Sequence, residues 1–72
     1  MVLFRKENDY MYKVIFNHKI EHQFESSATN AKDLLNDALN SYKLTNQHFD
    51  IKTIYHCTFI NLSNNREFEI YL

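Results

Sequence analysis

The chain has 72 residues, of which 44% are hydrophobic and 15% aromatic, and its eight basic and nine acidic residues leave a formal net charge of −1. A chain of this length and hydrophobic content predicts one small globular domain over residues 1–72, which excludes a second domain, a repeat array and a disordered chain. It has no apolar run of ~20 residues, which excludes a membrane-spanning helix. Its basic residues are too scattered to favour direct nucleic-acid binding.

The cysteine content and the composition indicate where such a chain works. Cys57 is the single cysteine and has no intramolecular partner, and the first residues lack the apolar region of a signal peptide. Both features predict a reducing, cytoplasmic setting. The chain has no Gly, Pro or Trp and is rich in residues with AT-rich codons, which indicates a low-GC bacterium, one of its phages or a mobile element.

Two segments before residue 25 are predicted to be extended. Residues 2–6 form either an additional strand or a loose arm. A β-hairpin follows, because apolar residues and one histidine alternate at period two on either side of Asn17-His18-Lys19. A three-residue loop pairs Phe16 with Ile20 and keeps the large apolar groups on one face. A two-residue turn would instead set Val14 opposite Gln23, so the register favours the longer loop. Asn17 or a neighbour must supply any positive φ. The alternating residues are Tyr10, Tyr12, Val14, Phe16, Ile20, His22 and Phe24.

Residues 31–42 change to a helical period and predict one amphipathic helix. Ser27 or Thr29 is the expected N-cap. Because a helix this short is marginal alone, its apolar stripe must pack on a sheet. The stripe consists of Ala31, Leu34, Leu35, Ala38, Leu39 and Tyr42.

The C-terminal residues 51–72 predict a second hairpin around Asn64-Asn65, taken as a two-residue type I′ turn. This register pairs Phe59 with Ile70 and Cys57 with Leu72 on one face. The opposite face pairs Thr58 with Tyr71, Ile60 with Glu69 and Leu62 with Glu67, and Ile54 and His56 extend it.

Together these elements predict an α+β fold of two layers. Two hairpins joined through a helix close most simply as an antiparallel sheet of four strands in the order 2-1-3-4, or of five strands if residues 2–6 join. The helix covers one face of the sheet and leaves the other open.

No arrangement of reactive side chains predicts catalysis, a cofactor or a metal. His56 and Cys57 are neighbours on a strand and point to opposite faces, and His18 and His22 complete no ligand set with them. Cys57 lies on the predicted core face, where a thiol is inert. A chain without Gly has no phosphate-binding loop. We therefore expect a protein that is not an enzyme.

The open sheet face is the candidate site, because a contiguous apolar patch marks a protein or dimer interface. The competing interpretation is that Val2, with Leu3 or Phe4, covers the patch. The candidate partner-binding residues are Met11, Ile15, Ile54, His56, Ile60, Leu62 and Tyr71.

Three segments, residues 12–16, 23–35 and 49–52, form a pattern that resembles the hairpin, helix and strand module of small phage early proteins, a family that includes inhibitors of host RNA polymerase. The resemblance implies a protein that acts by binding and blocking. The added C-terminal strand and the missing charged patch depart from that family, so the polymerase target is not carried over.

The leading hypothesis is a phage or mobile-element inhibitor of a host or defence protein, such as a CRISPR effector, nuclease or polymerase. The alternative is a homodimeric, antitoxin-like regulator associated with nucleic-acid transactions.

Overall fold

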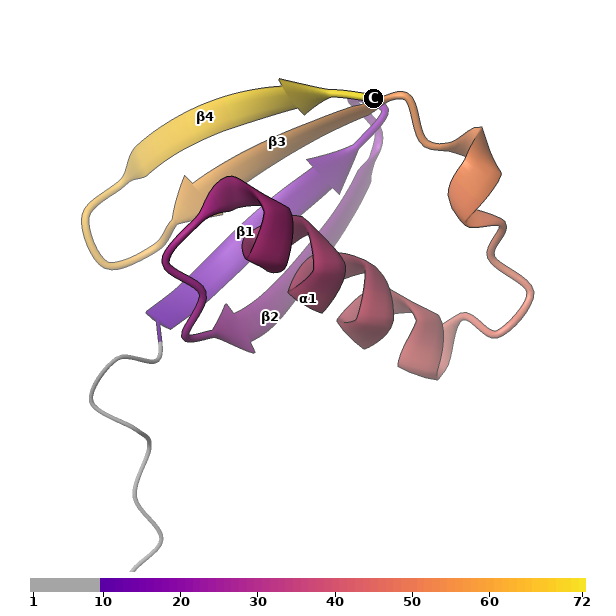
Figure 1. The fold of residues 1–72 in the computed structure, drawn as a ribbon, viewed down its shortest axis with the longest axis horizontal. Coiled ribbons are helices and arrows are strands. Elements are labelled where there is room, and N and C mark those ends of the chain that lie inside the picture. The colour runs from indigo at the N-terminus through magenta and orange to yellow at the C-terminus, as the bar shows by residue number, and fades with distance from the viewer. Residues whose placement is uncertain (1–9) are drawn as a thin grey trace, which may run out of the picture.

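The fold is known from a computed structural model that describes residues 10–72, so the strand or arm predicted for residues 2–6 lies outside the described residues. Four strands form one antiparallel sheet in the order β2-β1-β3-β4, and a single α-helix packs on one of its faces (Figure 1). This confirms the predicted α+β arrangement and strand order. The elements are β1 (Tyr10–Phe16), β2 (Ile20–Ser26), α1 (Ala31–Thr45), a 3-10 turn η1 (Ile51–Thr53), β3 (His56–Asn61) and β4 (Arg66–Tyr71).

The first hairpin has the predicted register. Phe16 pairs with Ile20 across the three-residue loop, and Tyr12 pairs with Phe24. Asn17 and His18 both adopt positive φ, at 54° and 63°, so the loop turns without a glycine because asparagine and histidine tolerate the left-handed region better than most residues.

The second hairpin differs from the prediction by two residues. Its loop is residues 62–65, and Asn61 pairs with Arg66, so that Phe59 lies opposite Phe68 and not opposite Ile70. The Asn61 side chain accepts a hydrogen bond from the Ser63 amide, and Asn65 takes the positive φ of 59°. A four-residue loop closed in this way replaces the expected type I′ turn. A shift of two leaves every side chain on its predicted face.

The helix begins at Ala31, with Asn30 as its N-cap. The Asn30 Oδ1 atom accepts a hydrogen bond from the Asp33 amide at 2.9 Å, so the expectation of Ser27 or Thr29 is wrong. The helix continues past Tyr42 to Thr45.

The core lies between α1 and the sheet. The helix contributes Leu34 and Ala38, which are buried, whereas the predicted stripe residue Ala31 is exposed. Figure 1 shows α1 crossing the half of the sheet that β1 and β2 form, so that β4 lies beyond its cover. The buried hydrophobic residues are Tyr12, Val14, Phe16, Phe24, Leu34, Ala38, Ile54, Cys57 and Phe59.

No helix within residues 10–72 combines the length and the apolar character that crossing a bilayer requires.

Candidate partner-binding surface

The sheet face opposite α1, called here the open face, is built from alternate residues of all four strands. The pairing of the strands places these side chains in rows that run across the sheet. One row joins Glu21, Ile15, Thr58 and Glu69, and the next joins Gln23, Lys13, Ile60 and Glu67. Each row therefore begins with a polar residue on β2, carries an aliphatic residue on a central strand, and ends with a glutamate on β4.

The middle of the open face carries three aliphatic side chains around Lys13. Met11 and Ile15 flank Lys13 on β1, Ile60 lies opposite it on β3, and all three aliphatic side chains are partly buried. Among the described elements, the single α-helix lies on the opposite face (Figure 1). The aliphatic centre is therefore available to a partner as far as residues 10–72 are concerned.

The two edges of the open face are acidic. Glu21 and Glu25 lie on β2, and Glu67 and Glu69 lie on β4. Within the four described strands, Lys13 is the one lysine or arginine on this face, and its Nζ lies 3.6 Å from Glu21 Oε1. Although the net charge of the whole sequence is only −1, the two outer strands of the open face are acidic. We call these four glutamates the acidic border.

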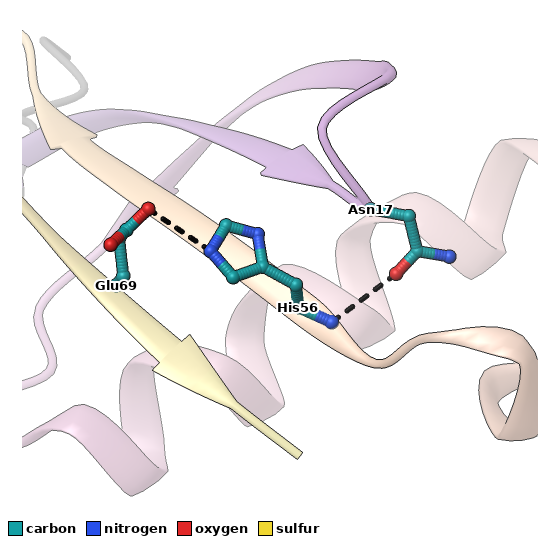
Figure 2. A network of polar contacts seen from close by, with 3 residues as sticks. All are labelled: Asn17, His56 and Glu69. Atoms are coloured by element: carbon teal, nitrogen blue, oxygen red, sulfur yellow. Dashed lines mark hydrogen bonds and ion pairs between the residues drawn. The ribbon is translucent and has the colours of Figure 1, made fainter.

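One end of the open face is held together by Asn17, at the tip of the first hairpin. The Asn17 Oδ1 atom accepts a hydrogen bond from the His56 amide at 3.2 Å (Figure 2). The same atom accepts from the Tyr55 amide at 2.8 Å, and the Asn17 Nδ2 group donates to the Thr53 carbonyl at 2.9 Å. The Asn17 amide also donates to the His56 carbonyl at 2.8 Å. These bonds fix the start of β3 against the loop after β1.

His56 is fully buried at this end of the sheet. Its Nε2 atom lies 3.1 Å from Glu69 Oε1 on β4 (Figure 2), and its ring contacts the rings of His18 and Tyr71, with centroids 3.9 and 4.7 Å away. Its Nδ1 atom has no hydrogen-bond partner within the part of the chain that the structure describes. The prediction that His56 offers its side chain to a partner is therefore wrong, and its role is to hold the loop, β3 and β4 together.

The prediction that Ile54 lies on the open face is also wrong, because Ile54 lies in the core at 6% exposure. Asp50 caps η1 through its Oδ1 atom, which accepts from the Lys52 amide at 2.9 Å. The chain turns there, and β3 begins only at His56. The alternation of the strand therefore does not extend back to Ile54.

The other predicted residues occupy different parts of this surface. Met11, Ile15 and Ile60 lie together at its centre, Tyr71 is exposed at the β4 edge, and Leu62 is exposed in the loop after β3. The open face thus brings together Met11, Ile15, Ile60 and Tyr71, with Leu62 beyond the end of β3.

Two polar contacts between the helix and β2 were not predicted from the sequence. The His22 Nε2 and Ser41 Oγ atoms lie 2.9 Å apart, and the Ser26 hydroxyl donates to Asp37 Oδ2 at 2.6 Å. Ser41 and Asp37 both adjoin the apolar stripe of the helix, which is the signal that could have indicated these pairs. Burial lowers the pKa of His22 below its usual 6.5, since removal from water penalises the charged imidazolium.

The described residues offer no ready chemical centre. No group of three or more His, Cys, Asp and Glu side chains in residues 10–72 is arranged to hold a metal ion. Cys57 is fully buried, and its burial raises the pKa of the thiol to about 11. The arrangement of the open face suits recognition, because its side chains present an apolar centre and fixed charge.

Comparison with protein-family models, with curated proteins and with solved structures finds no match to this chain.

Proposed function

We propose that this chain is a binding protein without enzymatic activity, which docks its open face on a partner protein and blocks that partner sterically. The observation that carries the proposal is the aliphatic centre of Met11, Ile15 and Ile60 on the sheet face opposite α1. Interfaces of this kind have an apolar centre that excludes water and a polar border that sets specificity.

Tyr71 is the expected anchor of the interface. Its side chain is 73% exposed at the β4 edge, beside the rigid cluster formed by His56 and Glu69. A tyrosine provides a large contact area with a hydroxyl at its tip, and few interface residues are as costly to truncate.

The charge of the open face favours a basic partner. Its four carboxylates repel the phosphates of nucleic acids, and two copies of the face opposed to each other place carboxylates near carboxylates. Proteins that handle nucleic acids carry the opposite charge, because they bind phosphates with Lys and Arg. The acidic border therefore supports a host or defence protein of that class, such as a CRISPR effector, nuclease or polymerase, over a homodimer.

The test compares two substitutions on the open face with one elsewhere. Ile60→Glu and Tyr71→Ala should abolish binding to a partner that is captured from a low-GC bacterial lysate, purified and rebound in a defined ratio, and should relieve any inhibition of its activity. Leu44→Glu is the matched control, because Leu44 is 78% exposed on α1. Fully retained binding by folded Ile60→Glu protein contradicts the proposal.

Two further outcomes contradict it. Light scattering that gives twice the 8.7 kDa mass of the chain, reduced to one chain by Ile60→Glu, supports the homodimer. A large loss of thermal stability in both open-face variants, matched by deletion of residues 1–6, identifies the face as one that the chain itself covers.

A further inference from the structure

We propose that the free edge of β4 receives an extended segment of the partner as a fifth strand, and that this segment alternates basic and apolar residues. The inference rests on the proposed binding function and deepens it. The open face gives the partner a surface, whereas the edge gives it a row of backbone hydrogen-bonding groups and a defined register.

The hydrogen bonding of β3 determines which backbone groups of β4 are free. The Leu72 amide donates to the Tyr55 carbonyl at 3.0 Å, and in an antiparallel pair the bonded positions alternate along the strand. The backbone amide and carbonyl groups therefore point toward β3 at residues 70, 68 and 66. The amide and carbonyl groups of Glu67, Glu69 and Tyr71 point the other way, toward the free edge.

The opposite side of β3 supports this assignment. The Leu62 amide donates to the Met11 carbonyl at 3.0 Å, and the Asn17 amide donates to the His56 carbonyl at 2.8 Å. Even-numbered residues of β3 thus bond to β1, which leaves its odd-numbered residues to bond to β4.

Charge is the protecting feature that the β4 edge carries, in Arg66, Glu67 and Glu69. Natural sheets block free edges with charged side chains, especially lysine, or with proline, bulges or very short strands. Here six consecutive residues from Arg66 to Tyr71 pair with β3 without interruption. No proline occurs in the chain, and Arg66, the one basic residue of β4, stands at its first position. Among residues 10–72 no strand pairs with this edge, which leaves it open to another strand.

The side chains beside this edge specify what an added strand carries. On the helix side, Phe68 is 41% and Leu72 58% exposed. An apolar side chain of the added strand packs against these two groups. On the open face, Glu67 and Glu69 favour lysine or arginine at the alternate positions.

A second copy of the chain fits the edge less well. Antiparallel pairing of β4 with its own copy about a two-fold axis places identical residue numbers symmetrically around the centre. A centre at residue 67 or 69 sets a glutamate opposite itself, and a centre at residue 68 sets Glu67 opposite Glu69. A centre at residue 70 avoids these pairs but aligns only residues 68–72 and leaves Glu67 without a partner. Like charges directly opposite each other destabilise a strand pair, so the charge pattern favours a basic segment.

The test uses a six-residue peptide that alternates lysine and valine, with a glutamate and valine peptide as its control. At saturating lysine peptide, amide hydrogen exchange of Glu67, Glu69 and Tyr71 should slow at least tenfold, and the control peptide should leave it unchanged. No slowing at millimolar lysine peptide, or equal slowing by both peptides, overturns the proposal. Slowing without peptide that depends on protein concentration identifies a second copy as the occupant and also overturns it.

A pair of variants separates the backbone contact from the charge. Glu67→Pro removes an amide that points to the free edge and should weaken peptide binding at least tenfold. Glu67→Thr keeps that amide and removes the charge, so its effect should be smaller. Equal effects of the two variants contradict strand addition. Ile15→Ser, a neutral change on the open face two strands away from β4, should weaken partner binding and leave peptide binding intact, so failure of the edge proposal is distinguishable from failure of the open-face proposal.

Discussion

The ring of His18 stacks on the ring of His56, with centroids 3.9 Å apart and planes 15° from parallel. The contact joins a loop residue to the first residue of a strand 38 positions later in the chain. It forms because His18 adopts a φ of 63°, which turns the loop back over β3. Together with the hydrogen bonds of Asn17, it holds the loop after β1 against the start of β3.

Substitution of Asn17 should reveal how much this connection contributes. Asn17→Gly keeps the positive φ but loses the three side-chain hydrogen bonds to residues 53, 55 and 56, and should cost about 1–3 kcal/mol of unfolding free energy. Asn17→Ala should cost about 1 kcal/mol more, because alanine disfavours the left-handed region. Urea unfolding measures both values. If Asn17→Gly is as stable as the parent chain, the side-chain hydrogen bonds do not contribute as described. If Asn17→Ala has the same unfolding free energy as Asn17→Gly, the positive φ at residue 17 carries no cost for alanine.

The helix should depend on Leu34 more than on any other leucine. Leu34 is 4% exposed, so Leu34→Ala should lower the unfolding free energy by about 2–5 kcal/mol. Leu39 is only partly buried, and Leu39→Ala should cost less. The exposed Leu44 serves as the control, with an expected change below about 0.5 kcal/mol. The same denaturant unfolding experiment ranks the three variants, and a different ranking contradicts the described packing.

The two hairpins show what a period-two pattern can predict. In the first hairpin, an alternative register would differ by one residue and exchange the two faces, so the apolar pattern excludes it. In the second, the predicted and observed registers differ by two, and Phe59 lies on the same face in both. The pattern cannot distinguish them. The choice depends on how the side chain of Asn61 bonds to the loop backbone, which composition alone does not reveal.

For the candidate site, too, the sequence predicts which face of a strand a residue occupies but not whether that residue is accessible. The central residues Met11, Ile15 and Ile60 follow from alternation within strands. The burial of His56 does not, because it requires His18 from a loop and Tyr71 from the last strand. Ile54 was misplaced because the capping of η1 by Asp50 ends the extended alternation before β3. Local periodicity therefore predicted the faces, whereas caps and loops decided which residues are accessible.

The Cys57 thiol should resist alkylation in the folded chain. Its pKa of about 11 leaves about one thiol in a thousand ionised at pH 8, and the side chain is fully buried. Iodoacetamide should therefore label it at least ~100-fold more slowly than in urea, since the thiolate is the reacting form. Ser63→Cys adds an exposed thiol in the 62–65 loop as an internal standard that should react rapidly. Mass spectrometry counts the labels, and comparable rates at the two positions contradict the burial of Cys57.

The burial of His22 beside Ser41 should make the fold less stable in mild acid. His22 packs between β2 and α1, where its ring lies 5.2 Å from that of Tyr42, and burial lowers its pKa below 6.5. The unfolded chain therefore binds more protons than the folded chain as the pH falls through 6.5. The contribution of His22 is complete above that pH and is lost progressively below it.

His22→Gln isolates this effect, because glutamine can still bond to Ser41 but does not titrate. Unfolding free energies measured in urea at pH 7.5 and pH 5.5 give the acid-induced loss for each chain. The loss should be larger for the parent chain than for the variant, and because the other three histidines are present in both chains, their contributions cancel in the difference. An equal loss in the two chains means that His22 keeps its ordinary affinity for protons in the folded state and contradicts the effect of burial. A smaller loss in the parent chain means that folding favours the imidazolium, which reverses the expected sign.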